Sequence, residues 1–211
     1  TNRDGLMSIS SATVHSIMRS DPDLMHPDLK LQIMLVSGKD RYSRSRKIGV
    51  DPFSGFNIGV FPIYPESRGS THIRSADPSE PPKIIANYLS APGDRALMLK
   101  GLKLVRKVAT QSAIAPHIVR EVRPGPEVDN DDGLLDYARR SGQTSWHPIS
   151  TCRMGREVTD VVDHDLRVHG IEGLRVVDSA IMPNMPTSNT NAPSIVIGEK
   201  GADLILLAAG H

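Results

Sequence analysis

The sequence predicts an α+β fold in which an antiparallel sheet is backed by helices. Strand-like and helix-like segments come in mixed clusters, without the regular strand–helix alternation of a parallel sheet. Two strand-like runs lie close together on either side of a turn containing Gly69, which is typical of an antiparallel hairpin. Apolar residues make up 38% of the 211 residues and aromatic residues only 4%, so we expect a sizeable aliphatic core.

The first 55 residues contain one predicted strand between two predicted loops. Residues 1–30 are polar and carry two prolines, which indicates a loop. Apolar side chains alternate along residues 30–36, which predicts a strand. Residues 38–55 are charged and punctuated by glycine, so we expect a solvated loop that is also a candidate for disorder. A functional basic patch is the alternative for this segment, whose cationic residues include Arg41, Arg44, Arg46 and Lys47.

The next segment predicts a hairpin. Residues 56–64 alternate between apolar and small or polar side chains, and a second strand-like run follows at residues 70–75. We therefore expect these two strands to pair with each other. The prolines of Asp77-Pro78 and Pro81-Pro82 then interrupt regular structure.

Three helices and a short strand are predicted in the rest of the chain. Residues 94–111 carry an apolar face at three- and four-residue steps, with Asp94 as the expected N-cap. Residues 129–140 begin with acidic side chains and end with basic ones, which suits the helix dipole. Residues 174–177 form a short apolar strand, and residues 193–207 form a closing helix with proline in its first turn.

Composition excludes several classes of protein and suggests a compartment. The formal charge is +1 without a long basic block, which argues against a nucleic-acid or membrane-surface binder. No window approaches the roughly 18 apolar residues of a membrane span. The single cysteine, Cys152, cannot form an internal disulfide and favours a reducing compartment. We expect a cytoplasmic protein, with membrane association of a longer protein as the alternative. The chain opens with Thr1 and shows no signal peptide, so a fragment or a processed chain is expected.

A series of motifs runs in order along the chain. The earlier ones are Pro27-Asp28-Leu29, Pro65-x-Ser67-Arg68-Gly69, Arg74-Ser75-Ala76-Asp77-Pro78, Asn87-Tyr88-Leu89-Ser90, Gly93-Asp94-Arg95 and Glu121-Val122-Arg123-Pro124-Gly125. The later ones are Trp146-His147-Pro148-x-x-Thr151-Cys152-x-Met154-Gly155, Leu174-Arg175-Val176-Val177-Asp178, Ser188-Asn189-Thr190-Asn191-Ala192-Pro193 and Gly198-Glu199-Lys200-Gly201-Ala202-Asp203. The series resembles the C-terminal portion of the glucose–methanol–choline (GMC) flavin oxidoreductases, most of all choline dehydrogenase and related alcohol dehydrogenases.

The resemblance implies a division of the chain and a cofactor. Residues 1–145 would form the family's substrate-binding domain, and residues 146–211 the catalytic motif and a segment that returns to the FAD-binding half. FAD would be bound mainly by an N-terminal portion, because the chain has no Gly-x-Gly pair to hold a pyrophosphate. We expect this chain alone to be inactive without that portion.

His147 is the candidate catalytic base. A flavin-dependent alcohol oxidation removes a proton from the hydroxyl, and histidine is the usual residue with a suitable pKa. The resemblance places the family's active-site histidine at this position, whereas an arbitrary histidine is more often a structural one. Pro148 restricts the backbone of His147 and helps to aim its ring. The family most often has glycine where this chain has Ser150.

Asn189 is the candidate partner of the base. The resemblance places a histidine or an asparagine here, before the closing helix, where its side chain would hydrogen-bond the substrate oxygen. Asn191 is the alternative, although an asparagine at that position could simply be the N-cap of the closing helix.

The resemblance also implies cofactor contacts. They would come from a stretch near the flavin and from the N-terminus of the closing helix, whose partial positive charge suits the pyrimidine edge of a reduced flavin. These residues are Asp178, Ser179, Asn191, Ala192 and Pro193. Asp178 could instead only terminate the preceding strand. Small residues on the closing helix would allow close packing against a neighbour, for which we expect the FAD-binding domain; they are Gly198, Gly201 and Ala202.

Trp146 is the candidate substrate contact. An indole beside the base could hold a quaternary ammonium by cation–π attraction, which hints at choline, while plain core packing is the alternative. The spacing of cysteine and histidine gives no metal motif. The sequence therefore predicts part of an enzyme that oxidises a primary alcohol to an aldehyde, with oxygen, a quinone or another compound as electron acceptor. A flavin-free binding or scaffold module derived from the same fold is the alternative.

Overall fold

The computed structural model describes residues 12–40, 49–187 and 189–210, and the chain divides into two compact units. Unit 1 comprises Thr1–Glu66 and Leu89–Gln143, and unit 2 comprises Ser67–Tyr88 and Thr144–His211. The predicted domain boundary at residue 145 lies close to the second junction, but residues 67–88 belong to the C-terminal unit. The roles assigned to the two predicted domains stay predictions.

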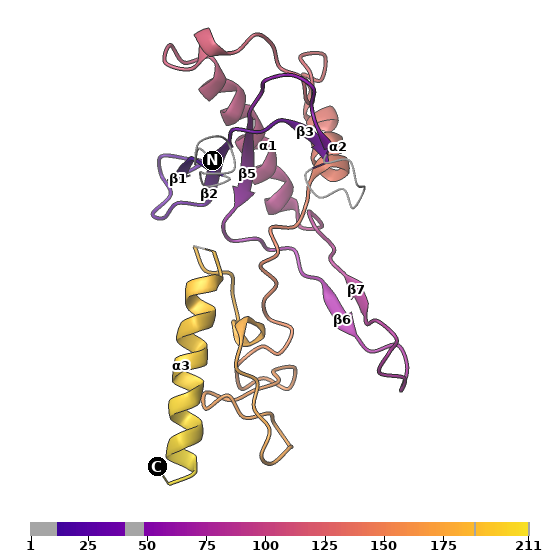
Figure 1. Cartoon of the computed structure of the whole chain (residues 1–211), viewed down its shortest axis with the longest axis vertical. Coiled ribbons are helices and arrows are strands. Elements are labelled where there is room, and N and C mark those ends of the chain that lie inside the picture. The colour runs from indigo at the N-terminus through magenta and orange to yellow at the C-terminus, as the bar shows by residue number, and fades with distance from the viewer. Residues whose placement is uncertain (1–11, 41–48, 188, 211) are drawn as a thin grey trace, which may run out of the picture. The chain divides into compact units, whose positions relative to one another are not determined.

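The sheet of unit 1 is antiparallel, in the order β1-β2-β5 (Figure 1). Its strands are β1 (Val14–Met18), β2 (Leu29–Met34) and β5 (Asn57–Pro62). The predictions for β2 and β5 are confirmed, and so is the α+β class with an antiparallel sheet. The loop predicted for residues 1–30 is wrong at β1. This strand lies at an edge, where Val14 and Ile17 are half-exposed, so its pattern lacks the alternation of a buried strand.

Part of the segment predicted to be a loop forms a small ladder instead. The antiparallel strands β3 (Gly38–Asp40) and β4 (Gly49–Val50) pair with each other. The cationic residues named for the suggested basic patch at positions 41, 44, 46 and 47 lie outside the described residues.

Helix α1 (Pro92–Ala109) packs on β2 and β5. A buried glycine, Gly101, permits this approach, because a Cβ there would clash with Val60 of β5. The helix is confirmed but the N-cap is not: Ala91 precedes Pro92 at the helix start, and Asp94 lies inside the first turn. Its carboxylate accepts a hydrogen bond from the backbone N–H of Glu66 at 2.8 Å, which explains an acidic side chain that is only 4% exposed.

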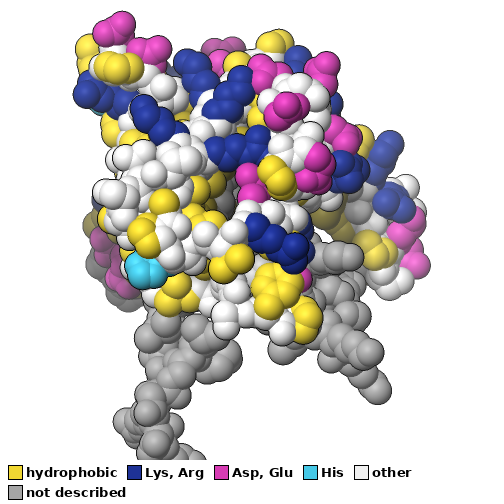
Figure 2. Space-filling view, turned by 90° about the horizontal axis from the view of Figure 1, so that it is seen from above, with side chains coloured by type: hydrophobic (Ala, Val, Ile, Leu, Met, Phe, Trp, Pro, Cys, Tyr) yellow, Lys and Arg dark blue, Asp and Glu magenta, His cyan; other side chains and the backbone are white. Residues whose placement is uncertain are grey.

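Helix α2 (Asp131–Ser141) confirms the prediction for residues 129–140. Its N-cap, Asn130, accepts a hydrogen bond from the backbone N–H of Gly133 at 2.8 Å. A 3₁₀ turn, η2 (Ala115–His117), lies between the two helices in sequence. On the face shown in Figure 2, basic and acidic side chains are interspersed.

The predicted hairpin is wrong in its pairing. Strand β6 (Ser70–His72) pairs with β7 (Lys83–Ile85), whereas β5 pairs with β2 in the other unit. The prolines between Asp77 and Pro82 occupy the connection of this hairpin, so the residues taken as an interruption are in fact its turn region. A Cβ at Gly69 would clash with the backbone carbonyl of Ile85, so glycine allows the close approach of these two segments.

The core of unit 2 consists of aliphatic side chains between irregular segments and one helix. Val162, Leu166 and Ile181 are buried at its centre, and side chains of helix α3 (Asn191–Ala208) pack against them. The predicted strand at residues 174–177 is wrong: this segment makes an isolated bridge and loop-type backbone hydrogen bonds to residues 166–168. The closing helix is confirmed, and it begins two residues earlier than predicted. No helix among the described residues has the length and apolar character needed to cross a membrane.

Candidate active site

The segment that contains His147 is fixed to the short 3₁₀ helix η3 (Ser179–Ile181). The backbone N–H groups of Cys152 and Met154 donate to the carbonyl oxygens of Ala180 and Ile181, at 3.0 and 2.9 Å. The hydroxyl of Ser179 donates to the carbonyl of Pro148 at 3.1 Å. The predicted base therefore lies on a chain segment that is held at several points.

Two residues close to His147 have a left-handed backbone conformation. Ser150 has φ of 66° and Trp146 has φ of 55°. This region favours glycine, which gives a physical reason for the glycine that the resembling family most often has at the position of Ser150. The hydroxyl of Ser150 donates to the carbonyl of Met182 at 2.6 Å, and this bond helps to hold the unusual conformation.

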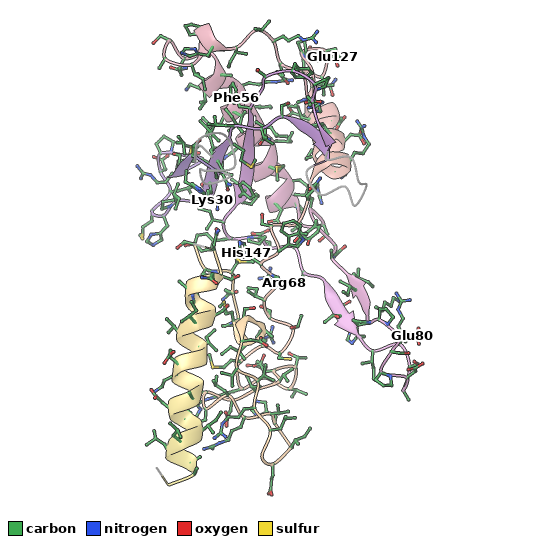
Figure 3. The ribbon with its side chains drawn as sticks, viewed as in Figure 1. Lys30, Phe56, Arg68, Glu80, Glu127 and His147 are labelled. Atoms are coloured by element: carbon green, nitrogen blue, oxygen red, sulfur yellow. The ribbon has the colours of Figure 1, made fainter. Side chains whose placement is uncertain are left out.

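His147 is joined to the start of α3 by a short hydrogen bond. Its Nδ1 lies 2.8 Å from the hydroxyl oxygen of Thr190. The ring is half-buried, and Thr190 is only 7% exposed. Figure 3 shows His147 near this end of the helix. The bond spans 43 positions of sequence, so it brings together the two motifs that were predicted to supply the base and its partner.

Thr190 was missed by the sequence reasoning. It lies between Asn189 and Asn191, the two residues that were predicted as candidate partners of the base. A threonine directly before a helix is ordinarily a capping residue, so the available signal pointed to a structural role. Asn189 is exposed and adjoins Thr190 in sequence, which puts its backbone beside the histidine–threonine bond.

The N-terminus of α3 has no side-chain cap. Its N-cap is Thr190, so the suggestion that Asn191 caps the helix is wrong. Asn191 and Ala192 are exposed in the first turn, and Pro193 is half-buried beside them. This arrangement leaves the positive end of the helix dipole accessible at the predicted cofactor residues.

Asp178 and Ser179 have structural partners in unit 2. The carboxylate of Asp178 accepts a hydrogen bond from the N–H of Ala180 at 2.6 Å and thereby caps η3, so it does not end a strand. Ser179 holds Pro148, as described above. Both residues shape the support of the His147 segment, and their contacts with a flavin stay predictions.

Trp146 is 60% exposed. The core-packing alternative for this indole is therefore not realised within the described residues. Its backbone N–H donates to the hydroxyl of Thr144 at 3.0 Å. Cys152 is a half-buried free thiol in the same segment.

A buried carboxylate organises the loop that follows the His147 motif. Asp160 is 8% exposed, accepts from Nε of Arg153 at 2.5 Å and accepts from the N–H of Glu157 at 2.7 Å. The backbone hydrogen bond from Glu157 and then the contact with Arg153 lower the pKa of Asp160 below its usual value.

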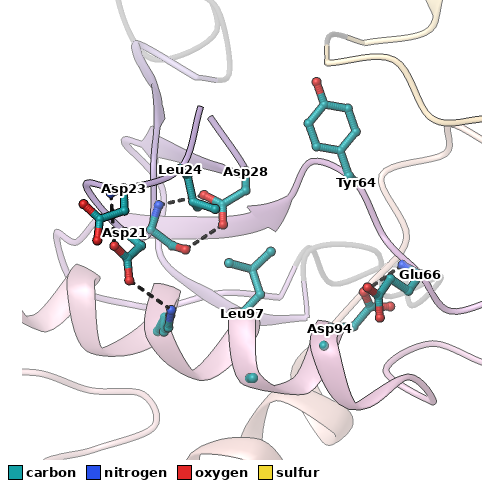
Figure 4. Close-up of a pocket in the computed structure, with 12 residues that line it drawn as sticks. Asp21, Asp23, Leu24, Asp28, Tyr64, Glu66, Asp94 and Leu97 are labelled. Carbon is teal, nitrogen blue, oxygen red and sulfur yellow. Dashed lines mark hydrogen bonds and ion pairs between the residues drawn. The ribbon is translucent and has the colours of Figure 1, made fainter. Parts of the chain in front are cut away.

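Unit 1 contains a cavity of about 480 Å³ beside the start of α1 (Figure 4). Its wall is rich in carboxylates and includes one aromatic ring; the charged and aromatic residues are Asp21, Asp23, Asp28, Tyr64, Glu66, Asp94 and Lys100. Asp28 accepts hydrogen bonds from both the backbone and the hydroxyl of Ser20, at 2.6 Å each. None of the predicted site residues lines this cavity.

Comparison with known proteins decides the family. The family model described as GMC oxidoreductase, which covers the C-terminal domain of that family, matches residues 65–198. The chain belongs to the GMC oxidoreductase family. GMC oxidoreductases are FAD-dependent enzymes that act on CH–OH groups.

Among curated GMC relatives, an alcohol dehydrogenase [acceptor] of Pseudomonas putida is 37% identical over 204 residues, which is 97% of this chain and 36% of that protein. An oxygen-dependent choline dehydrogenase of Staphylococcus xylosus is 34% identical over 191 residues, covering 89% of this chain and 33% of that protein. The crystal structure of pyridoxine 4-oxidase from Mesorbium loti matches with a TM-score of 0.77 at 26% identity, over 92% of this chain and 37% of that one. The chain thus spans about a third of the length of the curated relatives it matches.

Proposed function

We propose that this chain supplies the catalytic base and part of the substrate site of an FAD-dependent GMC enzyme that oxidises a primary alcohol to an aldehyde. The observation that carries the proposal is the 2.8 Å bond between His147 and Thr190, because it joins the histidine motif to the segment that contains Asn189. The identity to alcohol and choline dehydrogenases supports the same class of reaction.

His147 takes the hydroxyl proton in this proposal. A base must be held firmly yet be reachable by substrate, and a half-buried ring on a segment fixed to η3 meets both requirements. An imidazole is suited to the task because its ordinary pKa lies near neutral pH.

Asn189 positions the alcohol oxygen. Its carboxamide can donate a hydrogen bond but cannot act as a base at neutral pH, so the two side chains have separate roles. The side chain is exposed next to Thr190, which leaves it accessible to a ligand.

Choline is the substrate we favour. Trp146 is 60% exposed and adjoins the base in sequence, so the face of its indole can attract a quaternary ammonium. The choline dehydrogenases among the relatives favour the same choice.

FAD would complete the site, and when bound it accepts the hydride from the alcohol carbon. The residues present fit such a group, because the exposed, uncapped N-terminus of α3 suits the negative pyrimidine edge of a reduced flavin. Asn191 and Ala192 would hold it through their backbone. Most of the binding would come from a Gly-rich nucleotide-binding portion of the kind this chain does not contain.

A cytoplasmic location belongs to the same proposal, because a single free cysteine suits a reducing compartment.

Replacing His147 by alanine in the flavin-loaded protein that carries this chain tests the proposal. We expect flavin bleaching by anaerobic alcohol to slow by about 10²–10⁴-fold, because the hydroxyl proton loses its acceptor. The matched control is His164→Ala, an exposed histidine of the same unit. An unchanged rate of reduction in the His147→Ala protein would remove this residue from the mechanism.

A further inference from the structure

Thr190 uses its hydroxyl in an unusual way for its position. A threonine at an N-cap ordinarily accepts a hydrogen bond from an amide of the first helical turn. Here Thr190 is the N-cap of α3, yet its backbone is in the right-handed helical region and its side chain makes no capping bond. The hydroxyl instead meets Nδ1 of His147 at 2.8 Å.

The rest of Thr190 is tied into the helix, so the hydroxyl is held in place. Its carbonyl oxygen accepts from the N–H of Ser194 at 3.0 Å and from the hydroxyl of Ser194 at 2.6 Å. The residue is 7% exposed. A buried hydroxyl on the N-cap residue of a long helix is a rigid partner for an imidazole ring.

The partner of Nδ1 decides which nitrogen of a neutral imidazole can take a proton. When Nδ1 carries the hydrogen and donates it to an oxygen, the lone pair lies on Nε2. When an O–H donates to Nδ1 instead, the hydrogen lies on Nε2 and that nitrogen cannot act as a base. The threonine oxygen can accept in both the resting and the protonated state of the ring, so an accepting role needs no rearrangement during proton transfer.

We propose that Thr190 is a positioning residue for the base: its oxygen accepts a hydrogen bond from Nδ1–H of His147, and this bond sets the ring so that Nε2 faces the alcohol as proton acceptor. The role deepens the proposed function and rests on it.

Charge adds a second reason for this arrangement. The ring lies at the N-terminal end of α3, where the helix dipole is positive and opposes a new positive charge. An oxygen acceptor on Nδ1–H stabilises the imidazolium that forms when the substrate proton arrives. The hydrogen bond to Thr190 thus partly offsets the unfavourable interaction between the imidazolium and the positive N-terminus of α3.

The test compares two substitutions in the flavin-loaded protein. Thr190→Val keeps the shape and the β-branch but lacks the hydroxyl, and Thr190→Ser keeps the hydroxyl. We expect Thr190→Val to slow flavin reduction at saturating alcohol by about 10–100-fold, with the apparent Kd for the alcohol changed less than about threefold. Thr190→Ser should restore most of the rate. A loss that is equal in the two variants, or that appears only in the Kd, overturns the proposal.

A spectroscopic measurement gives an answer that does not depend on turnover. In histidine-labelled protein, the ¹⁵N shifts of the His147 ring, identified by their absence in His147→Ala, report which nitrogen carries the hydrogen. We expect hydrogen on Nδ1 in the unsubstituted protein and a shift toward Nε2–H in Thr190→Val. Hydrogen on Nε2 in the unsubstituted protein refutes the role of Thr190.

Failure of the two proposals can be distinguished. If His147→Ala reduces its flavin at the normal rate, the proposed function is wrong. If His147→Ala is slow while Thr190→Val matches the unsubstituted protein in both rate and tautomer, only the role of Thr190 is wrong.

Discussion

Asp160 is a buried carboxylate that holds the loop after the His147 motif. It accepts hydrogen bonds from the side chain of Arg153, which belongs to the His147 motif, and from the backbone N–H of Glu157. It also lies close to Gly155, where an added Cβ would clash with the carboxylate. The loop after the motif therefore folds around one negative charge.

The lowered pKa of Asp160 makes unit 2 sensitive to acid. Because the folded-state pKa lies below the unfolded value of about 3.9, the carboxylate adds stability above that value and loses it as the pH falls through the folded pKa. We expect Asp160→Asn to have a lower free energy of unfolding than the unsubstituted chain at pH 7. This difference in free energy should become smaller below about pH 4. Urea midpoints measured from pH 7 to pH 3 check this, with exposed Glu172→Gln as the control for removing one carboxylate. A difference that stays constant over this range contradicts it.

At the level of residues, the position of Ser150 could be predicted from the sequence, but its backbone conformation could not. The family pattern located the histidine motif and its departure from glycine, but not the left-handed backbone that explains the departure. Thr190 was missed for a related reason. Its hydrogen bond to His147 joins residues that are 43 positions apart, and no local sequence pattern predicts such a contact.

Helix α3 carries two glycines with different surroundings. Gly201 is buried, and a Cβ there would clash with Val177 inside the same unit. Gly198 lies one turn earlier, and a Cβ there would meet nothing within 4 Å. The close packing predicted for Gly201 is thus explained by a neighbour within unit 2, while Gly198 and the exposed Ala202 are accessible to another surface.

The two glycines should respond oppositely to alanine. Gly198→Ala should stabilise the isolated chain by up to about 1 kcal/mol, since alanine favours the helix and meets no obstacle. Gly201→Ala should destabilise it by about 1–3 kcal/mol, because Val177 or the helix must move. Urea unfolding followed by circular dichroism measures both. Equal effects of the two substitutions would show that the approach of α3 to Val177 is not tight.

At the level of elements, periodicity was reliable where a segment packs on one face and failed where pairing is decided at long range. The amphipathic helices α1 and α2 and the strands β2 and β5 were predicted because each presents a regular apolar face. The partner of β5 was not, because β5 pairs with β2, a strand distant in sequence, and α1 packs on both strands. A nearest-neighbour hairpin was the simplest inference, and tertiary contacts overrode it.

At the level of the whole molecule, the sequence predicted the fold class and the family correctly. The division into units departs from a cut along the chain, because the β6–β7 hairpin at residues 67–88 groups with the C-terminal residues. Such a grouping reflects contacts rather than composition, so sequence patterns alone do not reveal it.

The isolated chain should be colourless. Tight binding of a dinucleotide needs a Gly-rich turn that admits the pyrophosphate to a helix N-terminus, and the sequence has no Gly-x-Gly pair. The N-terminus of α3 alone offers too few contacts, since its first turn includes a proline without an N–H. Apolar side chains on α3 are also exposed, among them Ile195 and Leu206, as expected for a surface that another portion of polypeptide covers. Saturating the purified chain with FAD, desalting it and measuring absorbance near 450 nm should give far less than one flavin per chain. Stoichiometric retention would show that these 211 residues bind the cofactor without the proposed nucleotide-binding portion.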